Sequence, residues 1–150
     1  MQNRSRIRNG RANPIVVLGL AGLLVIGGFL LFNQESPDSA GAKFMFALAK
    51  GDSAKLTDLS YISGASKEDI KKQWDYATKV AAPHYLFAFR LNGSSQSSPD
   101  EASVKVMMFR NVGDPGSYEE KFELPMVRKE GRWLVDVAGI NRGLYPALPR

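Results

Sequence analysis

The residues that could do chemistry in this sequence are few. Cysteine is absent and histidine occurs once, as His84, among 150 residues. The sequence therefore offers no thiolate nucleophile and no cysteine or histidine cluster that could bind zinc. His84 follows Pro83 at an expected corner between a helix and a strand. It could act as a general base at the rim of a pocket, but an exposed corner histidine is the favoured interpretation.

Five aromatic side chains form the second candidate group. Their helical and strand spacing is typical of a hydrophobic core, and they could instead line a pocket for a small apolar ligand. The five residues are Trp74, Tyr85, Phe87, Phe89 and Trp133. The sequence thus predicts no catalytic residue, no metal site and no cofactor, and it predicts a ligand pocket only as the alternative to a filled core.

Three helices are expected to position the first of these residues. Ser36 is a candidate N-cap, Pro37 fits the first helical position and Gly51 is typical of a C-terminal stop, so the first helix is expected over 37–50. A short second helix follows Asp52, and a third begins after Ser66 and ends before Pro83. Their expected inward faces are Phe44, Ala47 and Leu48, then Leu56 and Leu59, then Ile70, Trp74, Ala77 and Ala81.

After Pro83 the apolar period changes from about four residues to two, which predicts strands. The four segments are 84–93, 102–112, 118–129 and 131–139, each with one apolar face. Helices followed by such strands predict an α+β domain over 38–138, with about three helices on a curved antiparallel sheet of about four strands. The segment 139–150 is broken by prolines and is expected to be an irregular tail.

The N-terminal fifth of the sequence predicts a membrane anchor. Residues 1–13 form a basic arm, and the uncharged run 14–32 would make a helix of about 28 Å, close to the ~30 Å of a bilayer's hydrocarbon core. The arginines of the arm place the N-terminus in the cytoplasm and the domain outside. Residues that mark the anchor are Pro14, Leu18, Leu24, Ile26 and Phe32.

A cleaved signal peptide is the alternative to this anchor. The apolar run is longer than a typical signal, and an Ala-x-Ala match at residues 40–42 lies well past Phe32, inside the first expected helix. We therefore expect an uncleaved single-pass cell-membrane protein whose residues 33–37 form a short linker. The domain would then lie close to the outer surface of the membrane.

Charge distribution argues against nucleic-acid binding. The net charge is +5, but four of the 20 basic residues lie in the arm, so the remaining 16 face 15 acids in a nearly neutral domain. A duplex-binding domain needs a basic face of its own. The expected partners are the membrane, through residues 14–32, and other envelope proteins, with a homo-oligomer left open.

Two short motifs lie near the ends of the expected domain. The first helix carries Phe-x-x-Ala-Leu-x-x-Gly-Asp from Phe44 to Asp52, and the last hairpin carries Glu-Gly-x-Trp-x-Val-Asp from Glu130 to Asp136. Together with the order of elements, they resemble the nuclear-transport-factor-like superfamily, the cystatin-like cone, over roughly 37–138. The resemblance implies a cone-shaped domain with a pocket between sheet and helices.

The resemblance implies several different functions, because members of the superfamily differ in what they do. Some members are enzymes, such as ketosteroid isomerase and scytalone dehydratase, and others are binding or scaffold modules. Several are single-pass membrane proteins with this domain outside, including scaffold components of type IV secretion systems and accessory proteins of mycobacterial lipid-import systems. This chain's arrangement matches that last group best, as a bacterial branch of the superfamily in the cell envelope.

An isomerase of this fold would need a carboxylate base inside the cone. The inward strand positions read as apolar, Asp136 alternates out of phase with its apolar neighbours, and Asp75 lies one position off the apolar face of its helix. The favoured function is therefore a membrane-tethered, extracytoplasmic, non-catalytic binding or assembly module. A carrier or sensor of a small apolar ligand in the cone is the alternative, and an isomerase- or dehydratase-like enzyme is the third hypothesis.

Overall fold

The computed structural model describes residues 35–150, which form one compact unit from Glu35 to Arg150. The predicted arm (1–13) and membrane helix (14–32) lie outside the described residues. Across 35–150, no helix is both long enough and apolar enough to cross a bilayer. The elements, in chain order, are α2 (Pro37–Lys50), α3 (Ser53–Leu59), β1 (Ser60–Tyr61), α4 (Lys67–Tyr76), the π-helix η1 (Ala77–Ala81), β2 (Ala88–Ser98), β3 (Glu101–Arg110), β4 (Tyr118–Lys129), β5 (Arg132–Asp136) and the 3₁₀-helix η2 (Val137–Gly139).

Each helix begins at the cap that the sequence predicts. The hydroxyl of Ser36 accepts from the N–H of Ser39 at 3.2 Å, and α2 then runs over the predicted range to Lys50. Gly51 ends it with φ 64°, a left-handed conformation that costs glycine little. Asp52 caps α3 and Ser66 caps α4 in the same way. The expected helix starts are therefore confirmed.

A π-turn changes the register at the end of the third helix. α4 gives way to η1, in which the N–H of Ala82 donates to the carbonyl of Ala77 at 3.0 Å, five residues back. The wider turn rotates every later residue relative to an α-helix. As a result Ala82 is buried and Ala81 is exposed, so the predicted inward position of Ala81 is wrong.

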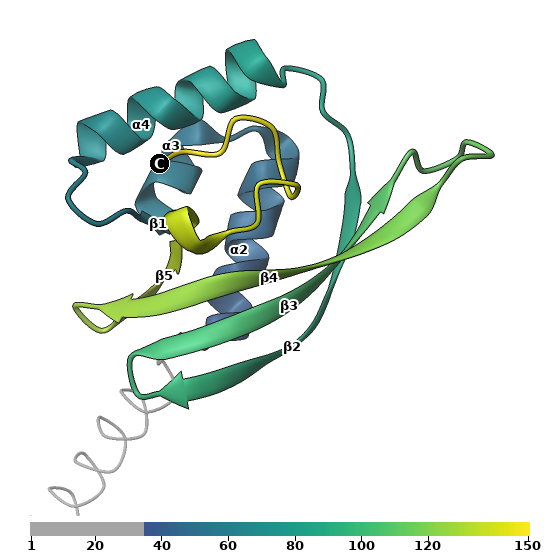
Figure 1. The fold of residues 1–150 in the computed structure, drawn as a ribbon. Coiled ribbons are helices and arrows are strands. Elements are labelled where there is room, and N and C mark those ends of the chain that lie inside the picture. Colours follow the sequence, from purple (N-terminus) through teal and green to yellow (C-terminus); the bar gives the residue numbers. More distant parts are fainter. Residues whose placement is uncertain (1–34) are drawn as a thin grey trace, which may run out of the picture. The chain divides into compact units, whose positions relative to one another are not determined.

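The sheet has one more strand than the sequence predicts, in the order β1-β5-β4-β3-β2 (Figure 1). The pairs β2–β3, β3–β4 and β4–β5 are antiparallel, as expected, but β1 pairs with β5 in parallel, with Ser60 opposite Val135. The predicted four-stranded antiparallel sheet is thus a five-stranded mixed one. A two-residue strand is too short for period-two alternation to reveal it.

β2 also differs from its predicted range of 84–93. It begins at Ala88 and continues to Ser98 through a polar stretch that reads as a loop, with register shifts between Leu91 and Ser94 and between Gln96 and Ser98. β2 is an edge strand, so these polar side chains face water while the backbone still pairs with β3. Hydrophobic patterning cannot detect such a segment.

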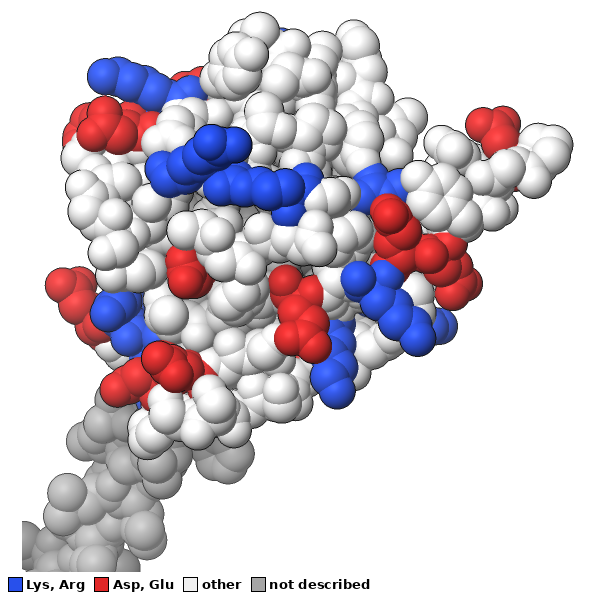
Figure 2. All heavy atoms as spheres, in the orientation of Figure 1, with Lys and Arg blue, Asp and Glu red and all other residues white. Residues whose placement is uncertain are grey.

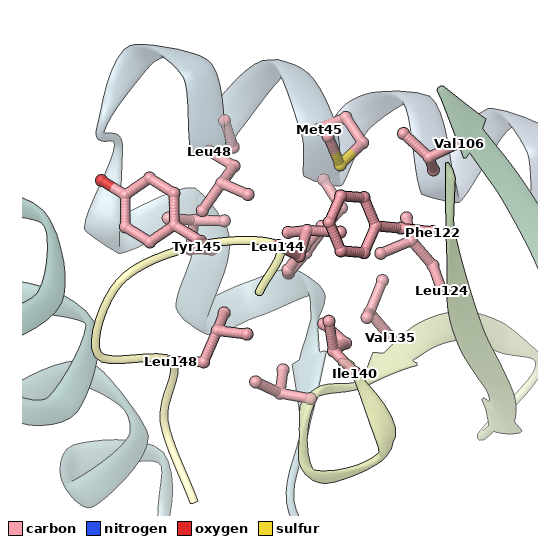
Figure 3. Close-up of a cluster of buried hydrophobic side chains, with 14 of the residues drawn as sticks. Met45, Leu48, Val106, Phe122, Leu124, Val135, Ile140, Leu144, Tyr145 and Leu148 are labelled. Atoms are coloured by element: carbon pink, nitrogen blue, oxygen red, sulfur yellow. The ribbon is translucent and has the colours of Figure 1, made fainter. Parts of the chain in front are cut away.

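The C-terminal segment 139–150 is irregular in backbone, as predicted, but it is not a tail outside the domain. Figure 3 shows its side chains between the sheet and the helices, facing Phe122 and Leu124 of β4. Its buried residues are Ile140, Leu144, Tyr145 and Leu148. The predicted domain boundary at 138 is therefore wrong, because irregular spacing hides how much of this segment is core.

Candidate binding site at the open end of the sheet

The predicted pocket residues do not share one site. Trp74 is fully buried, its indole N–H donates to the hydroxyl of Ser60 at 2.9 Å, and its ring meets Phe44 edge-on at 5.8 Å between centroids. Trp133 is also buried and lies under the guanidinium of Arg128 at 6.0 Å. Both tryptophans are parts of the packed core.

The other three predicted residues do come together. Tyr85, Phe87 and Phe89 are half-buried and form an aromatic row with Tyr145 of the C-terminal segment. The Tyr85 and Tyr145 rings meet edge-on at 5.2 Å, and the Phe87 and Tyr145 rings meet at 6.4 Å. At the other end of the row, Phe89 packs against the exposed Phe46 of α2 at 5.1 Å. The row therefore joins α2, β2 and the C-terminal segment.

Arg110 is a residue of this region that the sequence analysis did not single out. It is 9% exposed at the end of β3, and its guanidinium donates to Glu120 of β4 and to the main-chain carbonyls of Gly143 and Leu144. The same group lies over the ring of Tyr85 at 5.5 Å. Because charge-assisted hydrogen bonds are strong, Arg110 ties the C-terminal segment to the sheet.

The signal for this pair was present in the strand alternation. Val104, Val106 and Met108 are inward on β3, and two residues further the same face carries Arg110. On β4, Glu120 precedes the inward Phe122 by two residues and lies opposite Met108 in the register. The expectation that every inward strand position is apolar is therefore wrong. The exception at Glu120 is a carboxylate already engaged by a guanidinium.

The other candidate acids and the histidine are not arranged for acid–base chemistry. Asp75 accepts from Lys71 at 2.7 Å, from Lys79 at 2.5 Å and from the hydroxyl of Ser53 at 2.6 Å. These hydrogen bonds hold the pKa of the Asp75 carboxyl well below the usual range, and the bond from Lys71 has the largest effect. The carboxyl therefore stays ionised. Asp136 is half-buried after the buried Val135, and His84 is exposed.

Buried apolar side chains fill much of the space between helices and sheet. Leu144 and Leu148 of the C-terminal segment occupy it together with Met45 and Leu48 of α2 (Figure 3). A hollow of about 530 Å³ is lined by residues of α4 and of the C-terminal segment, among them Tyr145 and Leu148. Within residues 35–150, every buried side-chain nitrogen and oxygen has a hydrogen-bond partner. The same residues contain no cluster of three or more histidine and acidic side chains that could hold a metal.

Two neighbouring hollows lie on the surface where β2 begins and β3 ends. The larger, of about 550 Å³, is lined by His84, Tyr85, Leu86, Phe87, Ala88, Asn111, Val112 and Asp114. The smaller, of about 290 Å³, is lined by Ala88, Phe109, Val112, Gly113, Ser117, Tyr118 and Glu119. Ala88 and Val112 line both. We name the two hollows together the end patch.

The end patch concentrates exposed apolar side chains. Leu86 is 84% exposed, Val112 is 65% exposed and Tyr118 is 49% exposed. They come from three separate segments, before β2, after β3 and at the start of β4. In Figure 2 the projecting β3–β4 turn is white and red, without blue, and its charged residue is Asp114. An exposed cluster of this kind is a typical mark of an interaction site.

No family model and no curated protein sequence matches the chain. Similar solved structures include a ketosteroid isomerase-like protein from Erwinia carotovora atroseptica, at 12% identity and a TM-score of 0.47, covering 65% of this chain and 86% of that one. An NTF2-like protein of unknown function from Shewanella oneidensis has 12% identity and a TM-score of 0.45, covering 64% and 88%.

A protein with a SEC-C motif from Rhodopseudomonas palustris has 16% identity and a TM-score of 0.46, covering 76% of this chain and 88% of that one. At these identities and TM-scores, we carry no residue role, activity or partner from the three proteins to this chain.

Proposed function

We propose that this protein is a membrane-tethered, extracytoplasmic binding module that assembles with other envelope proteins without catalysing a reaction. The observation that carries the proposal is the filled interior. The space in which a conical pocket would hold a ligand is occupied by Leu144, Tyr145 and Leu148. Arg110 holds that segment in place by donating to the carbonyls of Gly143 and Leu144. Function is then left to the outer surface.

Affinity purification of the full-length chain from detergent-solubilised native membranes tests the proposal. The expected result is reproducible co-purification of envelope proteins with a bait whose intact mass retains the N-terminal 32 residues. A bait that has lost this segment and carries a bound small molecule, without protein partners, would instead support a secreted ligand carrier and overturn the proposal.

A further inference from the structure

We propose that the end patch binds an extended peptide segment of a partner protein, in which apolar residues alternate with basic ones, by addition of that segment to the edge of β2. The inference rests on the proposed function, because it names the partner chemistry of the same surface. Three independent features of the described residues lead to it: exposed apolar side chains, an open strand edge and local charge.

The apolar side chains supply the contact energy. Leu86 and Val112 are more than half exposed although both are large aliphatic residues, and they flank the hollow of about 550 Å³. Covering such side chains stabilises a complex by about 25 cal/mol for each Å² removed from water. Phe87 and Ala88, which line the same hollow, are apolar as well. A partner must therefore bring apolar side chains of its own.

The edge of β2 supplies the backbone template. β2 is the last strand of the sheet, and none of residues 35–150 pairs as a strand with its outer edge. From Ala88 to Leu91 its pairing with β3 is regular, and the protective register shifts begin only after Leu91. No proline or lysine lies between His84 and Leu91. A regular, unprotected edge beside exposed apolar side chains fits strand addition, in which alternate side chains enter the pockets.

The charges around the end patch indicate that the partner segment is basic. No lysine or arginine lines either hollow, although the chain from residue 35 onward has 16 of them. Asp114 and Glu119 do line the end patch, and neither has an ion-pair partner within residues 35–150. Complementary potentials steer association and disfavour like-charged partners. A segment with lysine or arginine between its apolar residues fits this environment.

The same charges argue against two other occupants. A second copy placed symmetrically on the end patch would bring Asp114 and Glu119 toward their own counterparts, which is repulsive. An anionic membrane surface would be repelled for the same reason. Arg90, which lies further along β2, lines neither hollow.

The test is a selection of random 12-residue peptides, displayed on phage, against the full-length protein in detergent. We expect enriched peptides in which aliphatic or aromatic residues alternate with lysine or arginine. Binding of a synthetic enriched peptide should fall about tenfold with Val112→Ser. It should be unchanged with Val80→Ser, a matched control because Val80 is also 65% exposed and lies in η1. A central proline in the peptide should abolish binding, because strand addition needs its N–H groups.

Several results would overturn the inference. They are the absence of enrichment, enrichment of acidic peptides, equal losses with Val80→Ser and Val112→Ser, and full tolerance of the central proline. Failure here is distinct from failure of the proposed function. If a Val112→Ser bait still co-purifies the partners of the wild-type protein, the assembly role stands and the end patch is not its site. If the wild-type bait has no partners, the assembly role fails whatever peptides bind.

Discussion

Leu144 gives the most direct test of the filled interior. Its side chain is fully buried in the C-terminal segment, beside Phe122 and Leu124. Leu144→Ala removes buried aliphatic atoms and leaves a cavity that surrounding side chains close only in part. Substitutions of this kind cost about 2–5 kcal/mol. For a urea m-value of about 1.5 kcal/mol/M, the unfolding midpoint should fall by about 1–3 M.

The measurement is urea unfolding of the full-length protein in detergent, followed by the fluorescence of Trp74 and Trp133, both of which are buried. Leu86→Ala is the matched control, because that leucine is 84% exposed and its truncation should change stability by no more than about 0.5 kcal/mol. Equal, small effects of the two substitutions would refute the reasoning. Residues 139–150 would then not be part of the core, and the cone would be open to a ligand.

Three further predictions concern polar groups. Arg110→Met should destabilise by about 3 kcal/mol in the same urea assay, because the carbonyls of Gly143 and Leu144 lose their donor; a loss below about 1 kcal/mol would contradict this tie. Trp74→Phe should cost about 1–3 kcal/mol through the lost hydrogen bond to Ser60 and the lost ring volume, and a neutral change would speak against it. Asp75 has a pKa below its unfolded value of about 3.8, so the stability difference between wild type and Asp75→Asn should be full above that pH and shrink as the pH falls; a difference that does not change between pH 7 and pH 2.5 would exclude this linkage.

The sequence predicted the helices well because their signals are local. Ser36 and Ser66 accept N–H groups three residues ahead, and Gly51 adopts the left-handed conformation that its position after the first helix suggests. Capping depends on two or three neighbouring residues, so it can be recognised without knowledge of the tertiary fold. The α+β class followed from the change of period after Pro83.

Two of the features that were missed depend on contacts distant in sequence, and the third is a local change of helix type. The parallel pairing of Ser60 with Val135 joins residues 75 positions apart, and neither segment carries a sequence pattern that predicts it. The burial of Leu144 depends on a sheet that forms elsewhere in the chain. The π-turn at Ala77 depends on a single additional residue in one turn. Local patterns carry no information on the strand pairing or on the burial of Leu144.

Part of the candidate site could have been predicted and part could not. Arg110 lies in phase with Met108, so strict alternation would have marked an inward cation and, by the same reasoning on β4, an inward Glu120. The end patch is different, because each of its apolar residues stands alone in a loop or at a strand end. Only the fold brings Leu86, Val112 and Tyr118 to one surface.

This difference explains why the two regions point to different roles. Polar groups of the interior form hydrogen bonds within the domain. Arg110 donates to Glu120 and to two main-chain carbonyls, and the indole N–H of Trp74 donates to Ser60. Satisfied groups in a filled space stabilise the fold and leave little with which to recognise a ligand. The end patch instead leaves apolar surface, a strand edge and two carboxylates open to water. These unsatisfied features can gain free energy when a partner binds, so recognition is expected there.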